Sequence, residues 1–159
     1  MSSGQANCED AKLVLELYDL RRETVMREAR TWVATHPPTS IDELMSVVNN
    51  FGSKENAYVR QVYGYWEMVA SLIVHGTLNA KLAHDTQGEM YFVYALIQPY
   101  ISEMRKRLDS PEFLQNLQKV IESTEEGRDR LARTQKRIAE FAKRAAASAG
   151  TAAAKQGAA

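Results

Sequence analysis

The sequence predicts an all-α fold: a single irregular bundle of about five or six helices, followed by an amphipathic, basic C-terminal helix and a disordered tail. Three observations lead to this prediction. Apolar residues recur every three or four positions, helix-capping residues precede several of these segments, and 159 residues with 45% hydrophobic and 25% charged content suit one soluble domain. We expect the bundle in residues 1–122, the amphipathic helix in 123–146 and the tail in 147–159.

The composition argues against several kinds of protein. Lysine and arginine together number 20, as do aspartate and glutamate, so the chain has no net charge to attract nucleic acid or an anionic surface. Because Cys8 is the single cysteine, no internal disulfide or zinc cluster can form. No apolar run approaches the roughly 20 residues that span a bilayer, and the N-terminal segment does not have the pattern of a secretory signal. We therefore expect a cytoplasmic protein.

The first helix is expected to start near Asn7, a favourable N-cap residue, and to end by His36, because two prolines follow. It carries two apolar stripes that are rotated with respect to each other and are separated by the polar residues 21–24. Either the helix bends at this polar block, or its two halves bury against different partners.

A short second helix is expected after Ser40. Ser40 and Glu43 have the spacing of a capping box, in which each side chain bonds the backbone N–H of the other residue. Its expected buried face consists of Ile41, Leu44, Val48 and Phe51.

A long helix is predicted over residues 54–75. When successive residues are placed 100° apart, the apolar side chains gather on one side, and Glu67 lies about 150° from the centre of that stripe. We therefore expect Glu67 on the polar face. Gly76 suits the left-handed conformation that follows a helix, which places His75 in the last turn, where an imidazole interacts favourably with the helix dipole.

The segment 86–108 combines a capping pattern with a strongly apolar run. Residues 86–89, Thr-Gln-Gly-Glu, have the pattern of a second capping box, and the run MYFVYALI follows at 90–97. A buried strand is a real alternative for so short a run, because its periodicity does not distinguish the two. The cap and the helical surroundings favour a central helix that is apolar on all sides. Pro99 then kinks it or opens a new segment.

Another helix start is predicted at Ser110. The serine would be the cap, Pro111 the first helical residue and Glu112 an acid in the first turn. Residues 122–127 should weaken or break this helix, and a final helix is expected over 128–144.

Four side chains are candidates for catalytic residues: Glu67, His75, His84 and Glu89. Their spacings match no known pair of metal ligands, and the sequence contains no HExxH, no GxSxG and no glycine-rich phosphate loop. We therefore predict no metal site and no cofactor. Because a helical bundle can bring any two carboxylates together, a pocket that uses these residues stays an alternative hypothesis.

The C-terminal segment holds the one local excess of charge. Residues 128–144 contain seven basic and two acidic residues, a net charge of +5, which leaves −5 for the rest of the chain. This pattern allows a solvated helix packed on its own bundle, a self-associating coiled coil or a contact with nucleic acid, whereas the narrow apolar face disfavours membrane binding. The candidate interaction residues are Leu131, Ile138, Phe141, Arg133 and Arg137.

Three segments within residues 58–122 carry a family resemblance: YGYWEMVASLIVHGTLN, GEMYFVYALIQPY and DSPEFLQNLQKVIE. In the first, a helix with two aromatic residues and a glutamate runs into a glycine and a short polar turn. These segments resemble a family of small bacterial helical proteins that is catalogued only as a domain of unknown function. The resemblance implies a helical fold and brings no established activity or site residue.

The predicted function is that of a non-enzymatic interaction or scaffold protein, which self-associates or binds a protein partner. The reason is a surplus of amphipathic surface without a catalytic constellation. The contact would use the rotated stripe of the first helix or the C-terminal coil. The alternatives are a small-ligand-binding protein or enzyme with a pocket between the central helices, and a nucleic-acid contact through the basic C-terminal helix.

Overall fold

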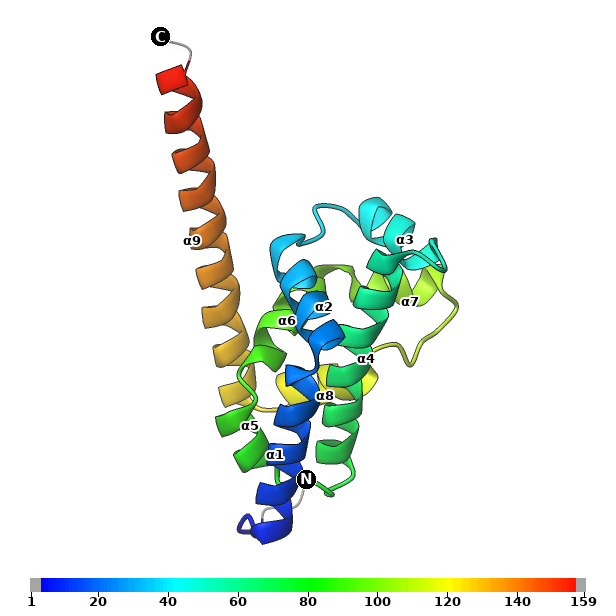
Figure 1. Ribbon diagram of the computed structural model, residues 1–159. Helices are drawn as coiled ribbons and strands as arrows, with labels where there is room; N and C mark the ends of the chain where they lie inside the picture. The colour runs from blue at the N-terminus through cyan, green and yellow to red at the C-terminus, as the bar shows by residue number, and fades with distance from the viewer. Residues whose placement is uncertain (1–3, 157–159) are drawn as a thin grey trace.

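The computed structural model (Figure 1) describes residues 4–156, with side chains up to residue 147. Every regular element in this part of the chain is a helix, which confirms the all-α class. The elements are α1 (Cys8–Arg22), α2 (Thr24–Thr35), α3 (Ile41–Asn49), α4 (Lys54–Val74), α5 (Ala80–Thr86), α6 (Glu89–Ile97), the 310 helix η1 (Gln98–Tyr100), α7 (Ile101–Arg107), α8 (Gln115–Glu122) and α9 (Glu125–Gln156). The described residues thus form more helices than the expected five or six, because several expected helices are interrupted.

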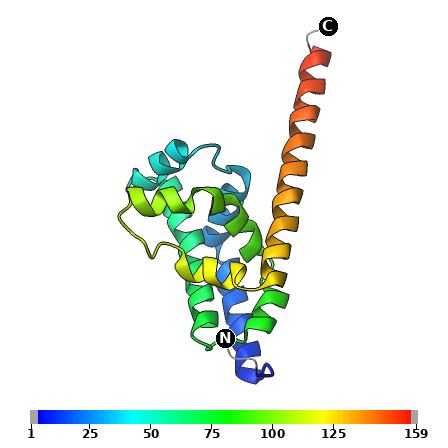
Figure 2. The ribbon, with the colours of Figure 1, turned by 180° about the vertical axis from the view of Figure 1, so that it is seen from behind.

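Helix α4 lies at the centre of the bundle. It packs against α2, α3 and α8, while α6 packs against α8 and α9. The largest fully buried side chains include Trp66, Ile73, Tyr91, Tyr94, Met104 and Leu117. Helix α9 lies beside α6 near its start and extends past the bundle at its C-terminal end, as the two opposite views in Figures 1 and 2 both show.

The first predicted helix is broken at Glu23, within the polar block of the sequence. Glu23 has an extended backbone (φ −54°, ψ 143°), and its side chain accepts a hydrogen bond from the Met26 amide, so it caps α2. The Arg30 side chain donates a hydrogen bond to the backbone carbonyl of Arg21, at the end of α1. Helix α1 then packs on α5 and α2 packs on α4, so the two apolar stripes do have different partners.

The second helix is confirmed with two changes. The Ser40 hydroxyl accepts from the Glu43 amide as predicted, but the Glu43 carboxylate bonds the amide and hydroxyl of Thr39 instead of the Ser40 amide. Phe51, predicted to be buried, is 75% exposed. The helix ends at Asn49, and the turn that contains Gly52 (φ +90°) carries Phe51 away from the core.

The apolar run at 90–97 is a helix, α6, and the strand alternative is wrong. The capping box predicted before it is also wrong. Gly88 occupies the N-cap position without a side-chain hydrogen bond, and the Thr86 hydroxyl instead donates to the Leu82 carbonyl within α5. Pro99 lies in η1, which separates α6 from α7, so the proline opens a new segment.

The helix start predicted at Ser110 is wrong as well. Residues 111–114 form turns, and α8 begins only at Gln115, after Leu114 in the left-handed region (φ +52°). The Ser110 hydroxyl bonds the Glu112 carboxylate instead of capping a helix. A carboxylate from another helix takes over the capping of α8, as described below.

Helix α9 is longer than the sequence analysis predicts. The break expected within 122–127 occurs between Glu122 and Glu125, but the helix continues to Gln156, through most of the segment expected to be a disordered tail. Alanine, which dominates this segment, has the highest helix propensity. The end of that expected tail, residues 157–159, lies outside the described residues. Among the described helices, none is both long and apolar enough to cross a membrane.

Candidate functional site

Glu67 caps a neighbouring helix. It lies on α4, half-buried, and one carboxylate oxygen accepts from the amide and the side-chain N–H of Asn116, at 3.0 and 2.8 Å. The other oxygen accepts from the Leu117 amide at 2.9 Å. Free amides and the positive end of the helix dipole make the first turn of α8 a favourable place for a carboxylate. Glu67 therefore replaces the N-cap side chain that Leu114 cannot supply.

The two candidate histidines have different surroundings. His75 is exposed and ends α4, where Gly76 adopts φ +73° as predicted. His84 is half-buried on α5, and its Nδ1 shares a 2.7 Å hydrogen bond with the Tyr91 hydroxyl. Burial, and then the positive charge of Arg130, lower the pKa of His84 below its ordinary range. His84 is thus a neutral part of the contact between α5 and α6.

Glu89 connects three helices. It lies at the start of α6, and both its oxygens accept hydrogen bonds from Arg30 of α2, each at 2.6 Å. Arg21 of α1 approaches to 3.5 Å and also donates to Gln87. A bidentate pair between arginine and a carboxylate fixes geometry as well as charge. Glu89 therefore holds α1 and α2 against α6.

The four candidate catalytic residues do not share one site. Glu67 is bound to α8, Glu89 to α2, and His84 to Tyr91, while His75 faces solvent. Within the described part of the chain, no three His, Cys, Asp or Glu side chains are grouped as a metal ion would require. The polar-face position predicted for Glu67 agrees with the structure, but its cap and the ion pair of Glu89 join residues far apart in sequence, which helical spacing alone cannot reveal.

The predicted interaction residues of α9 divide into two groups. The first turns of the helix pack on the bundle: Leu131 and Thr134 are buried, and the Arg130 guanidinium lies 4.4 Å from the centre of the Tyr91 ring. Gly127 is required at the start, because a Cβ there would collide with the Ile121 carbonyl. Leu131 is thus a contact within the protein, not a free interaction residue.

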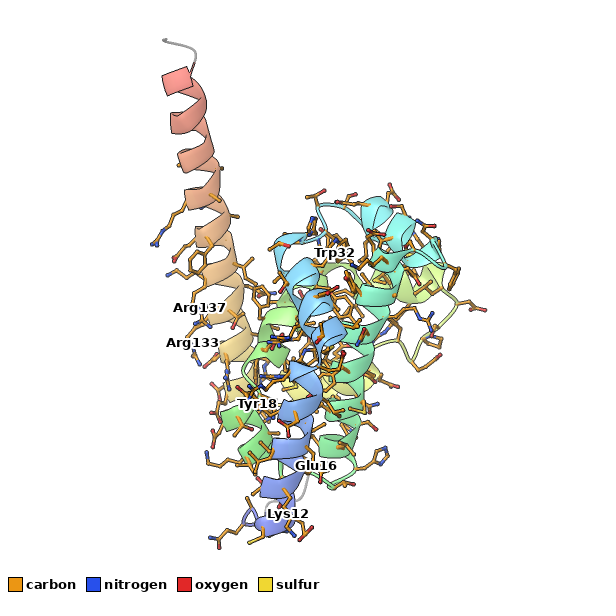
Figure 3. All side chains as sticks on the ribbon, viewed as in Figure 1. Lys12, Glu16, Tyr18, Trp32, Arg133 and Arg137 are labelled. Atoms are coloured by element: carbon orange, nitrogen blue, oxygen red, sulfur yellow. The ribbon has the colours of Figure 1, made fainter. Side chains whose placement is uncertain are left out.

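The other predicted residues of α9 are more accessible. Arg133 and Arg137 are exposed on the outer side of α9 (Figure 3), Phe141 is 68% exposed, and Ile138 is half-buried. A surface hollow between α6 and α9 contains Ile138 and Phe141 together with Phe92 and Arg137. We call the exposed surface of Arg133, Arg137, Ile138 and Phe141 the α9 arm surface.

A second accessible surface lies on α1. Leu15 is 65% and Tyr18 47% exposed, and the exposed Asp19 lies four residues after Leu15, on the same side of the helix, whereas the exposed Glu16 is turned about 100° from Leu15. The guanidinium groups of Arg21 and Arg22 lie 5.4 and 5.7 Å from the centre of the Tyr18 ring. Among the described residues, neither carboxylate has a hydrogen bond or ion pair. Figure 3 shows Glu16 and Tyr18 on this helix. The sequence analysis missed this α1 surface, because it followed the stripe through Leu17, which faces the core.

Comparison with known protein families gives one match. The family model described as "Domain of unknown function (DUF4760)" matches residues 6–124. The match covers three quarters of the chain and ends one residue before α9 begins. Comparison with the curated proteins and with the solved structures gives no match.

Proposed function

The chain belongs to the DUF4760 family. We propose that it is a non-enzymatic interaction protein that self-associates. In this proposal, the α9 arm surface of one copy binds the α1 surface of a second copy. The observation that carries the proposal is a basic helix that is anchored to the bundle by its first turns and leaves Phe141 exposed beyond them.

The extent of the family match supports separate roles for the bundle, α1 to α8, and for α9. Helices α1 to α8 lie within the matched residues 6–124, and α9 follows them. A bundle with its own buried core does not need a helix that extends far beyond it. The projecting part of α9 therefore has surface to offer to a partner.

Charge favours an acidic partner for α9 over a second α9. Residues 128–144 have a net charge of +5, and two such helices side by side would repel each other. The rest of the chain has a net charge of −5, and Glu16 and Asp19 are two carboxylates of the α1 surface that no described residue neutralises. A contact that sets the arm against Glu16 and Asp19 joins opposite charges, whereas Arg21 and Arg22 beside Tyr18 have the same sign as the arm.

Both surfaces also carry large apolar side chains. Ile138 and Phe141 on the arm, and Leu15 and Tyr18 on α1, are large side chains that would leave water on contact. If each arm reaches the α1 of the other copy, the two copies form a closed, isologous dimer with twofold symmetry. If each arm reaches the α1 of a further copy instead, the contact is heterologous and longer assemblies form.

The experiment is a light-scattering measurement of molar mass over a range of protein concentrations. The wild type should associate at low salt and dissociate at high salt, because the contact is electrostatic. Phe141→Ala should weaken the association. The matched control is Phe51→Ala, which removes an equally exposed phenylalanine from the turn between α3 and α4 and should leave the association unchanged. A monomeric wild type at high concentration and low salt contradicts the proposal.

The nucleic-acid alternative is tested with the same protein. If duplex DNA binds with an affinity that falls steeply with salt, and if Arg133→Ala and Arg137→Ala reduce that slope, the basic face of α9 serves nucleic acid. If duplex DNA does not bind to the protein, and the protein does associate with itself, self-association is the better explanation for the basic face of α9.

A further inference from the structure

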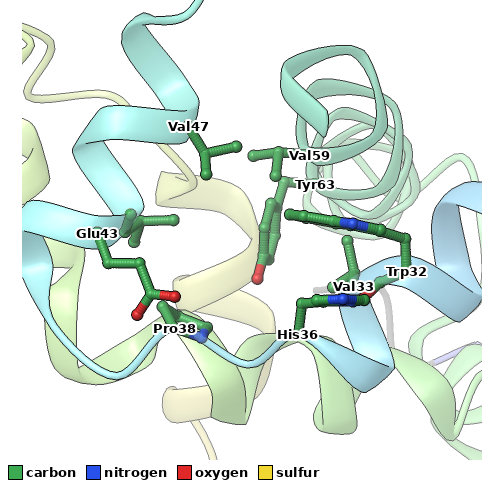
Figure 4. A pocket seen from close by; sticks show the side chains of 9 residues that line it. Trp32, Val33, His36, Pro38, Glu43, Val47, Val59 and Tyr63 are labelled. Carbon is green, nitrogen blue, oxygen red and sulfur yellow. The ribbon is translucent and has the colours of Figure 1, made fainter. Parts of the chain in front are cut away.

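A small cavity lies between α2, α3 and α4, away from α9 and from the α1 surface. Its volume is about 90 Å3, and it is open to solvent on one side. Most of its wall is apolar, and includes Val33, Leu44, Val47 and Val59. Figure 4 shows these helices around the cavity, with Trp32 and His36 on one side and Glu43 and Pro38 on the other.

Tyr63 brings a hydroxyl group to the cavity. The residue is only 4% exposed, and Figure 4 shows its hydroxyl pointing into the space between His36 and Glu43. Among the described residues, none forms a hydrogen bond with this hydroxyl. Other tyrosine hydroxyls in the bundle do have protein partners, as at Tyr58, Tyr65, Tyr91, Tyr94 and Tyr100.

The Tyr63 hydroxyl is not among the buried side-chain atoms of the described residues that lack a partner, so solvent reaches it at the mouth of the cavity. A ligand that accepts its hydrogen bond would take the place of that water. Burial raises the pKa of Tyr63, so the hydroxyl keeps its proton and remains a donor at neutral pH. The donor points into a space that no side chain fills.

The polar groups at the edge of the cavity are already engaged. The His36 ring stacks on Trp32 with 4.9 Å between centroids, and its Nδ1 lies 3.0 Å from the Trp32 carbonyl. The Glu43 carboxylate is bound by Thr39, and these hydrogen bonds lower its pKa, so it is ionised at neutral pH. A negative charge at the edge disfavours an anionic ligand.

We infer that this cavity binds a small neutral molecule with an apolar body and one hydrogen-bond acceptor, which receives the proton of the Tyr63 hydroxyl. Short-chain ketones, aldehydes and amides belong to this class. An apolar cavity of about 150 Å3 accepts benzene. By the same comparison, the 90 Å3 here holds about three or four non-hydrogen atoms, and the open side of the cavity leaves room for a further atom of the ligand.

The test is a titration with butan-2-one, followed through the methyl resonances of Val33, Val47 and Val59 in NMR spectra. Saturable shifts of these methyl groups are expected, whereas butanoate, which has the same carbon number but a negative charge, should give none. Tyr63→Phe should reduce the affinity for butan-2-one by about 2- to 10-fold, the range for one neutral hydrogen bond.

The variants also separate binding from a structural role. Because no protein group bonds the Tyr63 hydroxyl, Tyr63→Phe should leave the melting temperature of the free protein unchanged or raise it. The matched control is Tyr94→Phe, which removes a buried hydroxyl bonded to Glu122 and should lower the melting temperature while butan-2-one still binds. Val47→Phe should fill the cavity and abolish binding.

Two results would overturn the inference. One is the absence of saturable methyl shifts with butan-2-one in the wild type. The other is equal affinity in the wild type and in Tyr63→Phe, which would mean that the hydroxyl does not contact the ligand. Because the cavity and the α9 arm surface share no residue, either result leaves the proposal of self-association untouched.

Discussion

Glu67 shows how far a single residue can be interpreted from its spacing. Helical projection places it on the polar side of its helix, and the structure agrees that it is not part of the core. Its partners at 116 and 117 belong to a helix whose first residue the sequence analysis placed wrongly, so the capping contact could not be inferred. Local sequence patterns predict on which face of a helix a residue lies, whereas the element that packs against that face depends on the tertiary structure.

Replacing Glu67 should destabilise the bundle without affecting any reaction. In Glu67→Ala, three donors at the start of α8 lose their acceptor, and the free energy of unfolding should fall by about 1–2 kcal/mol. Urea denaturation measures this change. The control, Glu55→Ala, removes an exposed glutamate from the first turn of the same helix and should cost less than about 1 kcal/mol, the range for an acid near the positive end of a helix dipole. Equal effects in the two variants would show that the cap does not stabilise the protein.

His84 makes stability depend on pH. Its pKa in the folded protein is lower than the ordinary 6.5, so the unfolded chain binds a proton at higher pH than the folded chain does. The contribution of the neutral imidazole is therefore complete above pH 6.5 and is lost as the pH falls from there towards the folded pKa. The unfolding free energy, measured between pH 6.5 and 5, should decline less in His84→Gln than in the wild type.

The comparison for His84 is His75→Gln, which removes an exposed imidazole at the end of α4. This variant should keep the decline seen in the wild type. If instead His84→Gln shows the full decline, the burial of His84 against Tyr91 has no energetic consequence.

At the scale of the element, most helices could be predicted because their apolar spacing and local caps agree. Ser40 and the glycine at 76 act as the patterns indicate. The starts predicted at Thr86 and Ser110 fail for one physical reason: a suitable cap sequence is only a local preference, and tertiary contacts can outweigh it. Glu89 binds Arg30 instead of closing a capping box, and α8 takes its cap from another helix.

Truncation tests the division of α9 into an anchored and a projecting part. A chain that ends at Glu140 keeps Leu131, Thr134 and the Arg130 contacts, so its thermal unfolding should match that of the wild type. A chain that ends at Glu126 loses them and uncovers Tyr91, which should cost at least about 3 kcal/mol, as for a buried leucine removed from a core. If both chains unfold alike, the anchor does not belong to the bundle.

At the scale of the whole molecule, helical spacing, capping residues and composition together were enough to predict the fold class but not the interaction surfaces. A net charge of zero conceals a basic arm and an acidic remainder, and only their position in the structure shows which charges are free. The coiled-coil alternative for the C-terminal helix suggested an interface that includes Leu131, and the structure shows that Leu131 is already buried against the bundle. The exposed face of α1 could not be found, because one helix carries apolar residues on two sides and only packing decides which side is buried.

Exchange of charges between the two proposed surfaces tests the central claim most directly. One variant carries Arg133→Glu and Arg137→Glu on the arm, and the other carries Glu16→Lys and Asp19→Lys on α1. Sedimentation velocity should show each variant associating at least about tenfold more weakly than the wild type, because like charges then meet in the contact. In an equimolar mixture the reversed arm faces the reversed α1, and association should return. A mixture that stays as weak as its components, or single variants that associate like the wild type, would contradict the contact between α9 and α1.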